Sequence, residues 1–487
     1  MELKEWQDTL AGWDRGLGPR YLRLATHLRG SIQSGRILRG ARLPPERSLA
    51  QALGISRTTA VAAYEVLRSE GAIESRQGSG TFVRQVGDEP PASRQEHRLV
   101  GAFRRNTVFR GLLEEPGLAV EFLGAHLDAP APLLEEVQGF LREDAAATVA
   151  THGYIPGGLR ALRRAVAAHL TRSGLASHED EVLVTNGAQQ AIGLAAALFV
   201  ESGDAVAIED PTYLGAIDLF GSVGARLIPV PVTSSGLEVG RLRDAMAMAR
   251  LVYLVPSYHN PTGTVLPERE RREIARWVAD TQIPLVEDLA LADLRLGDDP
   301  PPPIAAFAPK APILTLGSMS KLFWGGLRVG WVRGPVPLIE RLSRLKALAD
   351  LGGPVLSQAV AARLLPRADE TMRLRRKEVR RKLARLTALL THSLPGWSWR
   401  LPEGGLLLWV RLPHGSASDF ARVAQGHGVA LVPGPVNSPS ESFDDYVRLP
   451  FVHDDDVMTR GVARLAQAWG DYEARAREPR PTLGVIV

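Results

Sequence analysis

The first 84 residues alternate apolar and polar positions in a way that defines a small domain. The pattern predicts three helices and then a two-stranded hairpin, over residues 20–34, 46–53, 57–70 and 73–83. Gly35, Gly54 and Gly71 are typical helix ends, and Ser56 is a typical N-cap of the third helix. Three helices followed by a hairpin form the order of a winged helix-turn-helix, an α+β fold. We therefore expect such a domain over residues 1–84.

Polar and proline-bearing residues then separate this module from the rest of the chain, and we expect a linker over residues 85–118. Beyond it, short apolar runs alternate with helical stretches, which predicts an α/β domain with a mostly parallel sheet over residues 119–487. From about residue 340 the pattern changes to long helices and a later strand, which indicates a small α+β subdomain. The runs that look like buried strands are 182–185, 205–208, 251–255, 284–286, 313–316 and 406–412.

Composition excludes several classes of function. The 487 residues include no cysteine, so disulfides, thiolate metal sites and cysteine nucleophiles are excluded, and we expect no metal centre. The first ten residues carry charges and lack an apolar run, so we expect no signal peptide. No apolar stretch approaches the length of a membrane helix. We expect a cytoplasmic protein without a membrane partner.

Charge is unevenly distributed along the chain. The whole chain carries a net charge of +4, but residues 1–84 hold thirteen lysines and arginines against eight aspartates and glutamates. A basic module therefore precedes a nearly neutral body. Such a module is either an ordinary solvated surface or the binding face for a polyanion.

The start of the third helix offers groups that suit a nucleic acid. In a helix-turn-helix the second helix of the pair enters the major groove, and here it begins Ser56-Arg57-Thr58-Thr59. Its free backbone N–H groups and hydroxyls can bind a phosphate, and Arg57 can contact a guanine or a phosphate. Gly80, at the hairpin, allows a close approach of the backbone because it lacks a Cβ.

These residues closely resemble the GntR family over about residues 19–84. The resemblance is carried by Gly35-Arg36-Ile37-Leu38, Leu43-Pro44-Pro45-Glu46-Arg47, Ser56-Arg57-Thr58-Thr59 and Gln77-Gly78-Ser79-Gly80-Thr81-Phe82-Val83. It implies that double-stranded DNA is contacted by Arg47, Ser56, Arg57, Thr58 and Gly80. The alternative is that Ser56 only caps its helix and Arg47 only pairs with an acid.

The large domain carries residues that suit pyridoxal phosphate, which needs an imine-forming lysine, an acid at the pyridine nitrogen and a phosphate cup. Lys321 follows a strand in Ser318-Met319-Ser320-Lys321, and Arg328 comes seven residues later. The serines and the arginine can hold a phosphate beside the lysine. A lone lysine is usually a solvated surface residue, but this one lies in an apolar, glycine-rich context.

Further candidates follow the other strands. Asp288 can keep the pyridine nitrogen protonated, or it can simply cap a helix. Asn260 can hydrogen-bond the ring's phenolic oxygen, or Asn-Pro can simply form a turn. The helix start at residues 186–190 can bind phosphate, and Tyr213 can stack on the ring.

At this point the large domain resembles a fold-type I aminotransferase over roughly residues 119–480. The resemblance implies that Lys321 forms the imine, Asp288 binds the pyridine nitrogen, Asn260 the phenolic oxygen, and that Tyr213 stacks. It further implies a homodimer, in which Tyr154 reaches the partner's phosphate, and an arginine, Arg448, that binds a substrate carboxylate. The phosphate ligands that it implies are Gly187, Ala188, Gln189, Ser318, Ser320 and Arg328.

A GntR reader joined to such a domain resembles the MocR arrangement. One departure concerns the tyrosine that usually follows the acid by two or three positions, because residues 289–292 are Leu, Ala, Leu and Ala. Pyridoxal phosphate should still bind, but efficient transamination is placed in doubt. We therefore expect a transcription regulator that senses an amino compound or pyridoxal phosphate itself; the alternative is an aminotransferase with an accessory DNA-binding domain.

The basic stretch at residues 373–382 holds seven lysines and arginines. It is either a second DNA surface or, as we expect, a solvated helix face.

Overall fold

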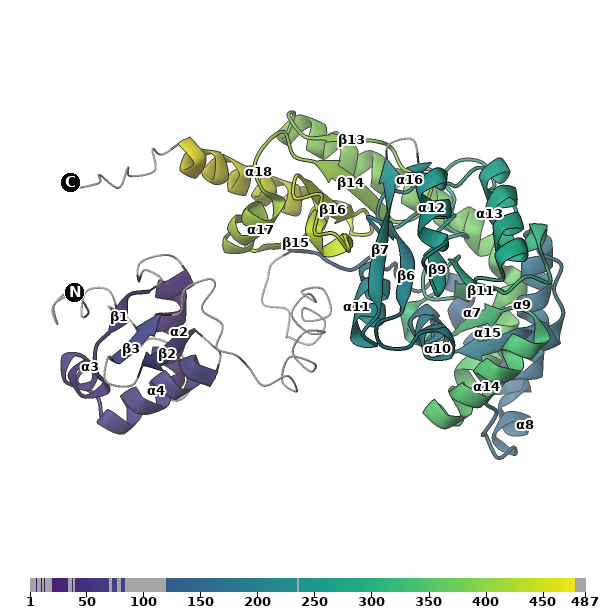
Figure 1. Cartoon of the computed structure of the whole chain (residues 1–487), viewed down its shortest axis with the longest axis horizontal. Helices are drawn as coiled ribbons and strands as arrows, with labels where there is room; N and C mark the ends of the chain where they lie inside the picture. The colour runs from purple at the N-terminus through teal and green to yellow at the C-terminus, as the bar shows by residue number, and fades with distance from the viewer. Residues whose placement is uncertain are drawn as a thin grey trace. The chain divides into compact units, whose positions relative to one another are not determined.

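The chain divides into two compact units, Met1–Arg98 and Leu99–Val487, drawn in Figure 1. The computed structural model describes residues 20–33, 40–69, 72–76, 80–83, 120–233 and 236–477, with single residues at 6, 10, 13 and 37. The expected linker, the hairpin tip at residues 77–79 and the helix ends at Gly35 and Gly71 lie outside the described residues.

The N-terminal unit has the predicted three helices and hairpin. Its elements are α2 (Arg20–Gln33), β1 (Arg42–Leu43), α3 (Glu46–Leu53), α4 (Arg57–Ser69), β2 (Ile73–Arg76) and β3 (Gly80–Val83). The strands form an antiparallel sheet in the order β1-β3-β2. Leu24, Leu28, Leu49 and Leu67 are fully buried between the helices. The winged helix-turn-helix prediction is confirmed, and within the described part of residues 20–83 the pattern missed the two-residue strand β1.

The large unit is built on an eight-stranded sheet. In spatial order its strands are β5 (Val182–Thr185), β12 (Gly330–Arg333), β11 (Ile313–Ser318), β10 (Leu285–Asp288), β9 (Leu251–Leu254), β6 (Ala205–Asp210), β7 (Arg226–Thr233) and β8 (Gly236–Leu237). Only β12 and the short β8 run against the other strands of this described sheet. The prediction of a mostly parallel α/β sheet is therefore confirmed.

Helices cover both faces of this sheet, which is why its central strands are apolar throughout rather than alternating. One apolar cluster joins the sheet to α9, α12, α13 and α15, and another joins it to α10, α11 and α14. The helices are α7 (Ala131–Glu143), α8 (Ala145–Val149), α9 (Arg160–Arg172), α10 (Ala188–Phe199), α11 (Leu214–Ser222), α12 (Val239–Met246), α13 (Glu268–Thr281), α14 (Val336–Asp350) and α15 (Val355–Leu364). Short 3₁₀ helices are η1 (Glu179–Glu181), η2 (Ile304–Phe307), η3 (Gly325–Leu327), η4 (Leu365–Arg367) and η5 (Gly434–Asn437).

A smaller α+β subdomain follows, but it begins at about residue 368 rather than 340, because α14 and α15 pack on the large sheet. It contains α16 (Ala368–Ser393), β13 (Ser398–Trp399), β14 (Leu407–Arg411), α17 (Ala417–Gly426), β15 (Val429–Pro433), β16 (Tyr446–Pro450) and α18 (Asp455–Arg477). Its sheet has the order β13-β14-β16-β15-β4, where β4 (Val120–Phe122) comes from the start of the large unit and pairs parallel with β15. The strand pattern of the sequence did not reveal this edge strand.

Side chains of the basic stretch in α16 bind backbone carbonyl groups of other segments. Arg375 and Lys382 are buried, and they donate to the carbonyl oxygens of Phe323 and Val452, respectively. Arg376 and Arg380 donate to the carbonyls of Gly297 and Leu296. The expectation of a solvated face is therefore wrong for the buried Arg375 and Lys382, whereas Arg376 is half-buried and Arg380 is exposed. Among the described residues, no helix is long and apolar enough to cross a membrane.

Candidate functional site

Five of the residues singled out in the sequence follow, or end, strands of the large sheet. Gly187 follows β5, Tyr213 follows β6, Asn260 follows β9, Asp288 ends β10 and Lys321 follows β11. These strands are parallel to one another, so their carboxyl ends meet at one edge of the sheet. In open α/β sheets this edge is where ligands bind.

Asp288 is a buried acid at this edge. One carboxylate oxygen accepts a hydrogen bond from the hydroxyl of Tyr253 at 2.7 Å, and the other accepts from the backbone N–H of Ala290 at 2.8 Å. Burial raises the pKa of Asp288, while the two hydrogen bonds and the nearby Lys321 oppose this rise. The carboxylate is thus held in a fixed orientation, as a partner of a ring nitrogen requires. The sequence reasoning missed Tyr253, although a tyrosine in a fully buried strand needs a hydroxyl partner.

Lys321 is also largely enclosed. Its Nζ donates to the carbonyl oxygen of Ala125 at 2.7 Å. Burial lowers the pKa of Lys321 to about 8, with further lowering by Arg448 and Arg328 and a contrary effect of Asp288. The uncharged amine, which a nucleophile toward a carbonyl group requires, is therefore more abundant near neutral pH than in an ordinary lysine.

Arg328 lies against the start of α10. Its Nη2 donates to the carbonyl oxygen of Asn186 at 2.9 Å, and its guanidinium passes close to the Cα of Gly187, where a Cβ would be 3.2 Å away. Gly330 packs directly on Gly187, since a Cβ there would lie 2.8 Å from its Cα. A guanidinium beside the N-terminus of a twelve-residue helix suits a phosphate group.

The serines before Lys321 lie at the same edge. Ser318 is buried at the end of β11, and its Oγ accepts from the backbone N–H of Ser320 at 3.2 Å. Ser318 also pairs with Gly330 across β11 and β12. The phosphate roles of the two serines and of Ala188, the first residue of α10, stay predictions.

Gln189, which we expected to bind the phosphate, holds the side chain of Tyr213. Its hydroxyl donates to Gln189 Oε1 at 3.1 Å, and Gln189 Nε2 donates to the carbonyl oxygen of Gly215 at 3.0 Å. Burial, with a contribution from Asp288, raises the pKa of Tyr213 to about 12, so its ring stays neutral. The side chain of Gln189 therefore orients Tyr213. Only the backbone N–H of Gln189 then serves the expected contact with a phosphate.

Two polar atoms of the site are buried and lack a hydrogen-bond partner. They are Oδ1 of Asn260 and Nε of Arg448. Arg448 lies on β16, donates through Nη2 to the carbonyl oxygen of Leu123 at 2.6 Å, and has a pKa lowered by burial to about 10. Buried groups without partners are uncommon and suit a polar ligand. Together with Lys321, Asp288 and Arg328, they fit pyridoxal phosphate bound with a carboxylate-bearing compound.

Tyr154 is an exposed residue. Its side chain is 66% exposed, and its ring stacks on His152 with centroids 6.4 Å apart. Its expected contact with the phosphate of a partner subunit stays a prediction.

In the N-terminal unit, the expected DNA-reading residues lie at the surface. Ser56 Oγ accepts from the backbone N–H of Thr59 at 3.1 Å and therefore caps α4. Arg47, Arg57 and Thr58 are exposed, and Thr59 is partly exposed. Ser56 thus has a structural role, which does not prevent it from also contacting a phosphate.

Gly80 begins β3 with φ at 111°, a conformation that favours glycine. A Cβ at this position would lie 2.9 Å from Nε of Arg42, whose side chain runs along the wing. Arg42 is exposed and pairs with Phe82 across β1 and β3. The sequence reasoning missed Arg42 because only the pairing of β1 with β3 brings it to the wing.

Comparison with known families shows a helix-turn-helix reader joined to an aminotransferase domain. Residues 20–83 match the family of bacterial regulatory proteins of the gntR type, and residues 123–465 match aminotransferase class I and II. The chain belongs to the aminotransferase class I and II family and has the architecture of the MocR-type regulators. This class implies pyridoxal phosphate as the cofactor of the large domain.

Similar proteins include both regulators and enzymes. The chain is 32% identical to the uncharacterized HTH-type transcriptional regulator YisV of Bacillus subtilis, over 84% of this chain and 87% of that one. It is 27% identical to the probable rhizopine catabolism regulatory protein MocR of Rhizobium meliloti, over 85% and 86%. Among solved structures it resembles LysN, an alpha-aminoadipate aminotransferase of Thermus thermophilus complexed with N-(5'-phosphopyridoxyl)-L-leucine. That similarity has a TM-score of 0.70 and 30% identity, and it covers 77% of this chain and 97% of that one.

Proposed function

We propose that this MocR-type regulator binds operator DNA through its N-terminal unit under the control of a small amino compound, or of pyridoxal phosphate itself, at the Lys321 site. One observation carries the proposal: a single chain presents the exposed residues Arg57 and Thr58 at the start of a recognition helix and also a buried cofactor site built around Lys321 and Asp288. A cytoplasmic location is part of this proposal, because a protein that binds operator DNA acts there.

The residues of the site have complementary tasks. When bound, pyridoxal phosphate supplies a carbonyl carbon that combines with amines and a ring that withdraws electrons. Lys321 would present a partly uncharged amine to it, Asp288 would hold the ring nitrogen, and Arg328 would neutralise the phosphate. Arg448 has an unpartnered Nε for a carboxylate. An amino acid or an amino compound with a carboxylate is the ligand that these groups suit.

Residues 123–130 connect the site to the start of the large unit. Three of their carbonyl oxygens, in Leu123, Ala125 and Asp128, accept from Arg448, Lys321 and Arg375, respectively. A ligand that draws the side chain of Arg448 or Lys321 toward itself would weaken the first two of these contacts. The segment follows β4 and the expected linker in the chain, so its adjustment provides a route toward the DNA-binding unit.

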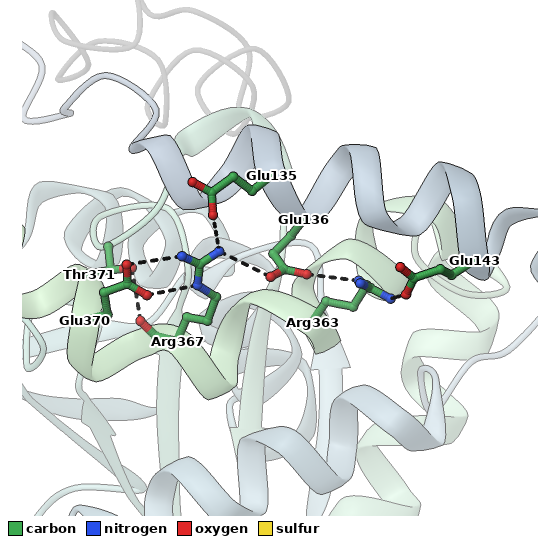
Figure 2. A network of polar contacts seen from close by, with 7 residues as sticks. All are labelled: Glu135, Glu136, Glu143, Arg363, Arg367, Glu370 and Thr371. Atoms are coloured by element: carbon green, nitrogen blue, oxygen red, sulfur yellow. Dashed lines mark hydrogen bonds and ion pairs between the residues drawn. The ribbon is translucent and has the colours of Figure 1, made fainter.

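The other end of this segment is held firmly by charged side chains on α7. Arg363 on α15 binds Glu136 at 3.0 Å and Asp144 at 2.7 Å, and Arg367 binds Glu135 at 2.6 Å. Figure 2 shows the contacts of Arg363 with Glu136 and of Arg367 with Glu135, which join α7 to the helices beside it. Networks of several charges constrain geometry better than isolated surface pairs do.

A homodimer is part of the proposal. Exposed apolar side chains gather where residues 152–159 pack against the end of α14 and the start of α15, because Gly352 contacts the backbone of Ile155 and Gln358 accepts from Leu159 N–H. Apolar surface of this kind favours association. The exposed side chains in this region are Tyr154, Leu348, Leu351 and Leu356.

Aminotransferase activity is the alternative function. The lowered pKa of Lys321 and the buried Asp288 favour it. The replacement of the usual tyrosine by the apolar residues 289–292 speaks against efficient turnover. Assays with an amino-acid panel and a keto-acid acceptor separate the two: turnover at ordinary enzyme rates, about 1 per second or faster, would favour the enzyme.

The regulator is tested by DNA-binding titrations. The DNA is the region upstream of its own gene and of neighbouring genes, and the full-length chain is used with and without pyridoxal phosphate and the amino-acid panel. We expect sequence-specific binding whose affinity changes with at least one of these ligands, and we expect Lys321→Ala to lose the covalent response. Failure to bind any of this DNA specifically under every ligand condition contradicts the proposal.

A further inference from the structure

Tyr253 lies directly behind the acid of the cofactor site. It is a fully buried residue of β9, and its hydroxyl donates to Oδ2 of Asp288 on the neighbouring strand β10 at 2.7 Å. Tyr253 pairs with Val286, so Asp288 comes two residues further along β10 and projects from the same face of the sheet. The contact therefore follows from strand register rather than from a flexible loop.

The hydroxyl can only be a donor in this contact. Burial and the nearby Asp288 raise the pKa of Tyr253 well above its ordinary value, so it keeps its proton. Ala290 N–H occupies the other carboxylate oxygen. The charged groups that also influence Asp288 are Glu209 on β6, which disfavours its charge, and Lys321, which favours it. Tyr253 and Lys321 thus both lower the pKa of Asp288, whereas burial and Glu209 raise it.

We propose that Tyr253 is a positioning residue: its hydroxyl keeps Asp288 ionised and oriented toward the pyridine nitrogen of the cofactor. This inference rests on the proposed cofactor site. Positions 289–292 lack the phenol that usually follows the acid, and Tyr253 supplies a phenol at the acid itself, from another strand. Tyr253 donates to the carboxylate of Asp288. It would therefore support binding of the cofactor through Asp288, but it would not replace the tyrosine that usually bonds the phenolic oxygen.

A purely structural role for Tyr253 makes a different prediction. Its ring packs edge-on against Phe220 with centroids 5.9 Å apart, and Tyr253→Phe retains this packing. Only the hydroxyl is lost, so the carboxylate loses one donor while the core keeps its shape. A structural role affects folding alone, whereas a positioning role acts through Asp288.

The test is a double-mutant cycle in the full-length protein with Tyr253→Phe, Asp288→Asn and both together. Pyridoxal phosphate is titrated into each apoprotein, and both the affinity and the absorption spectrum of the bound cofactor are recorded. We expect Tyr253→Phe to weaken binding about tenfold, the size of a hydrogen bond to a charged group, and to shift the absorption. On the Asp288→Asn background the same change should alter affinity by less than about twofold.

Tyr258→Phe is the matched control, because the hydroxyl of Tyr258 donates to the carbonyl oxygen of Asp298 and not to Asp288. It should leave affinity and spectrum unchanged. Equal losses on both backgrounds, or an unchanged affinity and spectrum in Tyr253→Phe, would overturn the inference. If the parent chain binds no pyridoxal phosphate, the proposed function fails instead, so the two failures are distinguishable.

A second measurement does not depend on the tyrosine variant. In protein labelled at the tyrosine ring carbons, a titration by NMR reports the ionisation of Tyr253. Asp288→Asn should lower the pKa of Tyr253 because it removes the neighbouring negative charge. An unchanged pKa contradicts the coupling between the two residues.

Discussion

Arg448 on β16 donates a hydrogen bond of 2.6 Å to the carbonyl oxygen of Leu123, directly after β4. The same arginine keeps its Nε buried and without a partner. A buried guanidinium with a spare donor is an uncommon arrangement that a carboxylate would complete. The residue that we propose to recognise a ligand carboxylate is thereby also the residue that holds Leu123, directly after β4.

Arg448→Gln should separate recognition of the carboxylate from binding of the cofactor. We expect the affinity for an amino acid such as alanine to fall at least about tenfold, because hydrogen bonds to charged groups contribute about 1.5–3 kcal/mol. Ethylamine, which lacks the carboxylate, is the matched ligand, and the variant should change the affinity for it little or not at all. Both are measured as changes in the absorption of the bound cofactor. Equal effects on the two ligands would exclude Arg448 from carboxylate recognition.

The pKa of Lys321 predicts how cofactor loading depends on pH. The uncharged amine is the reactive form, and its fraction rises as the pH passes upward through the pKa, which is about 8. The rate of formation of the visible absorption should therefore rise with pH and level off above about 8. A lysine with an ordinary pKa of about 10.4 would give a rate that continues to rise. Lys321→Ala should not form this absorption at any pH.

Ser56 offers a way to separate helix capping from DNA contact. Ser56→Ala removes the side-chain acceptor of Thr59 N–H and should cost about 1 kcal/mol of stability of the N-terminal unit. Ser56→Asp retains a cap but places a negative charge at the helix start. If Ser56 contacts a phosphate, Ser56→Asp keeps the thermal stability and loses DNA affinity. Unchanged affinity in Ser56→Asp leaves Ser56 with the capping role alone.

Gly80 has a backbone conformation that favours glycine at the start of β3. Gly80→Ala should destabilise the N-terminal unit by about 1 kcal/mol because its φ is 111°, whereas the exposed Arg42 side chain beside it can move aside. Arg42→Ala should leave stability nearly unchanged. It should weaken binding to all DNA sequences alike and reduce the slope of log affinity against log salt concentration by about 1. Binding isotherms at several salt concentrations measure this. Arg57→Ala is the comparison, since loss of a base contact would change sequence preference instead.

The apolar region around Tyr154 predicts a concentration-dependent dimer. Leu351→Glu places a charge among exposed apolar side chains and should shift the chain toward monomer in sedimentation experiments. Tyr154→Phe retains the apolar ring and should keep the dimer, but it should weaken binding of pyridoxal phosphate if its hydroxyl reaches the partner's phosphate. A Leu351→Glu variant that remains dimeric would place the interface elsewhere.

The sequence by itself determined the elements whose signals are local. The helices 46–53 and 57–69 and the strand 182–185 follow from apolar spacing, helix caps and glycine stops, which act over a few residues. Lys321, Asp288 and Asn260 were also evident, because each follows or ends a buried strand of a parallel sheet, where the carboxyl ends converge.

Only the tertiary structure decided which distant groups meet. The pairing of β4 with β15, the hydroxyl of Tyr253 on Asp288 and the guanidinium of Arg42 beside Gly80 all depend on strand register between remote segments. The same holds for the arginines of α16, whose spacing indicated a solvated face although buried carbonyl groups from other segments take up Arg375. Hydrophobic periodicity predicts which face of an element is buried, but it does not predict which polar groups of other elements lie against that face.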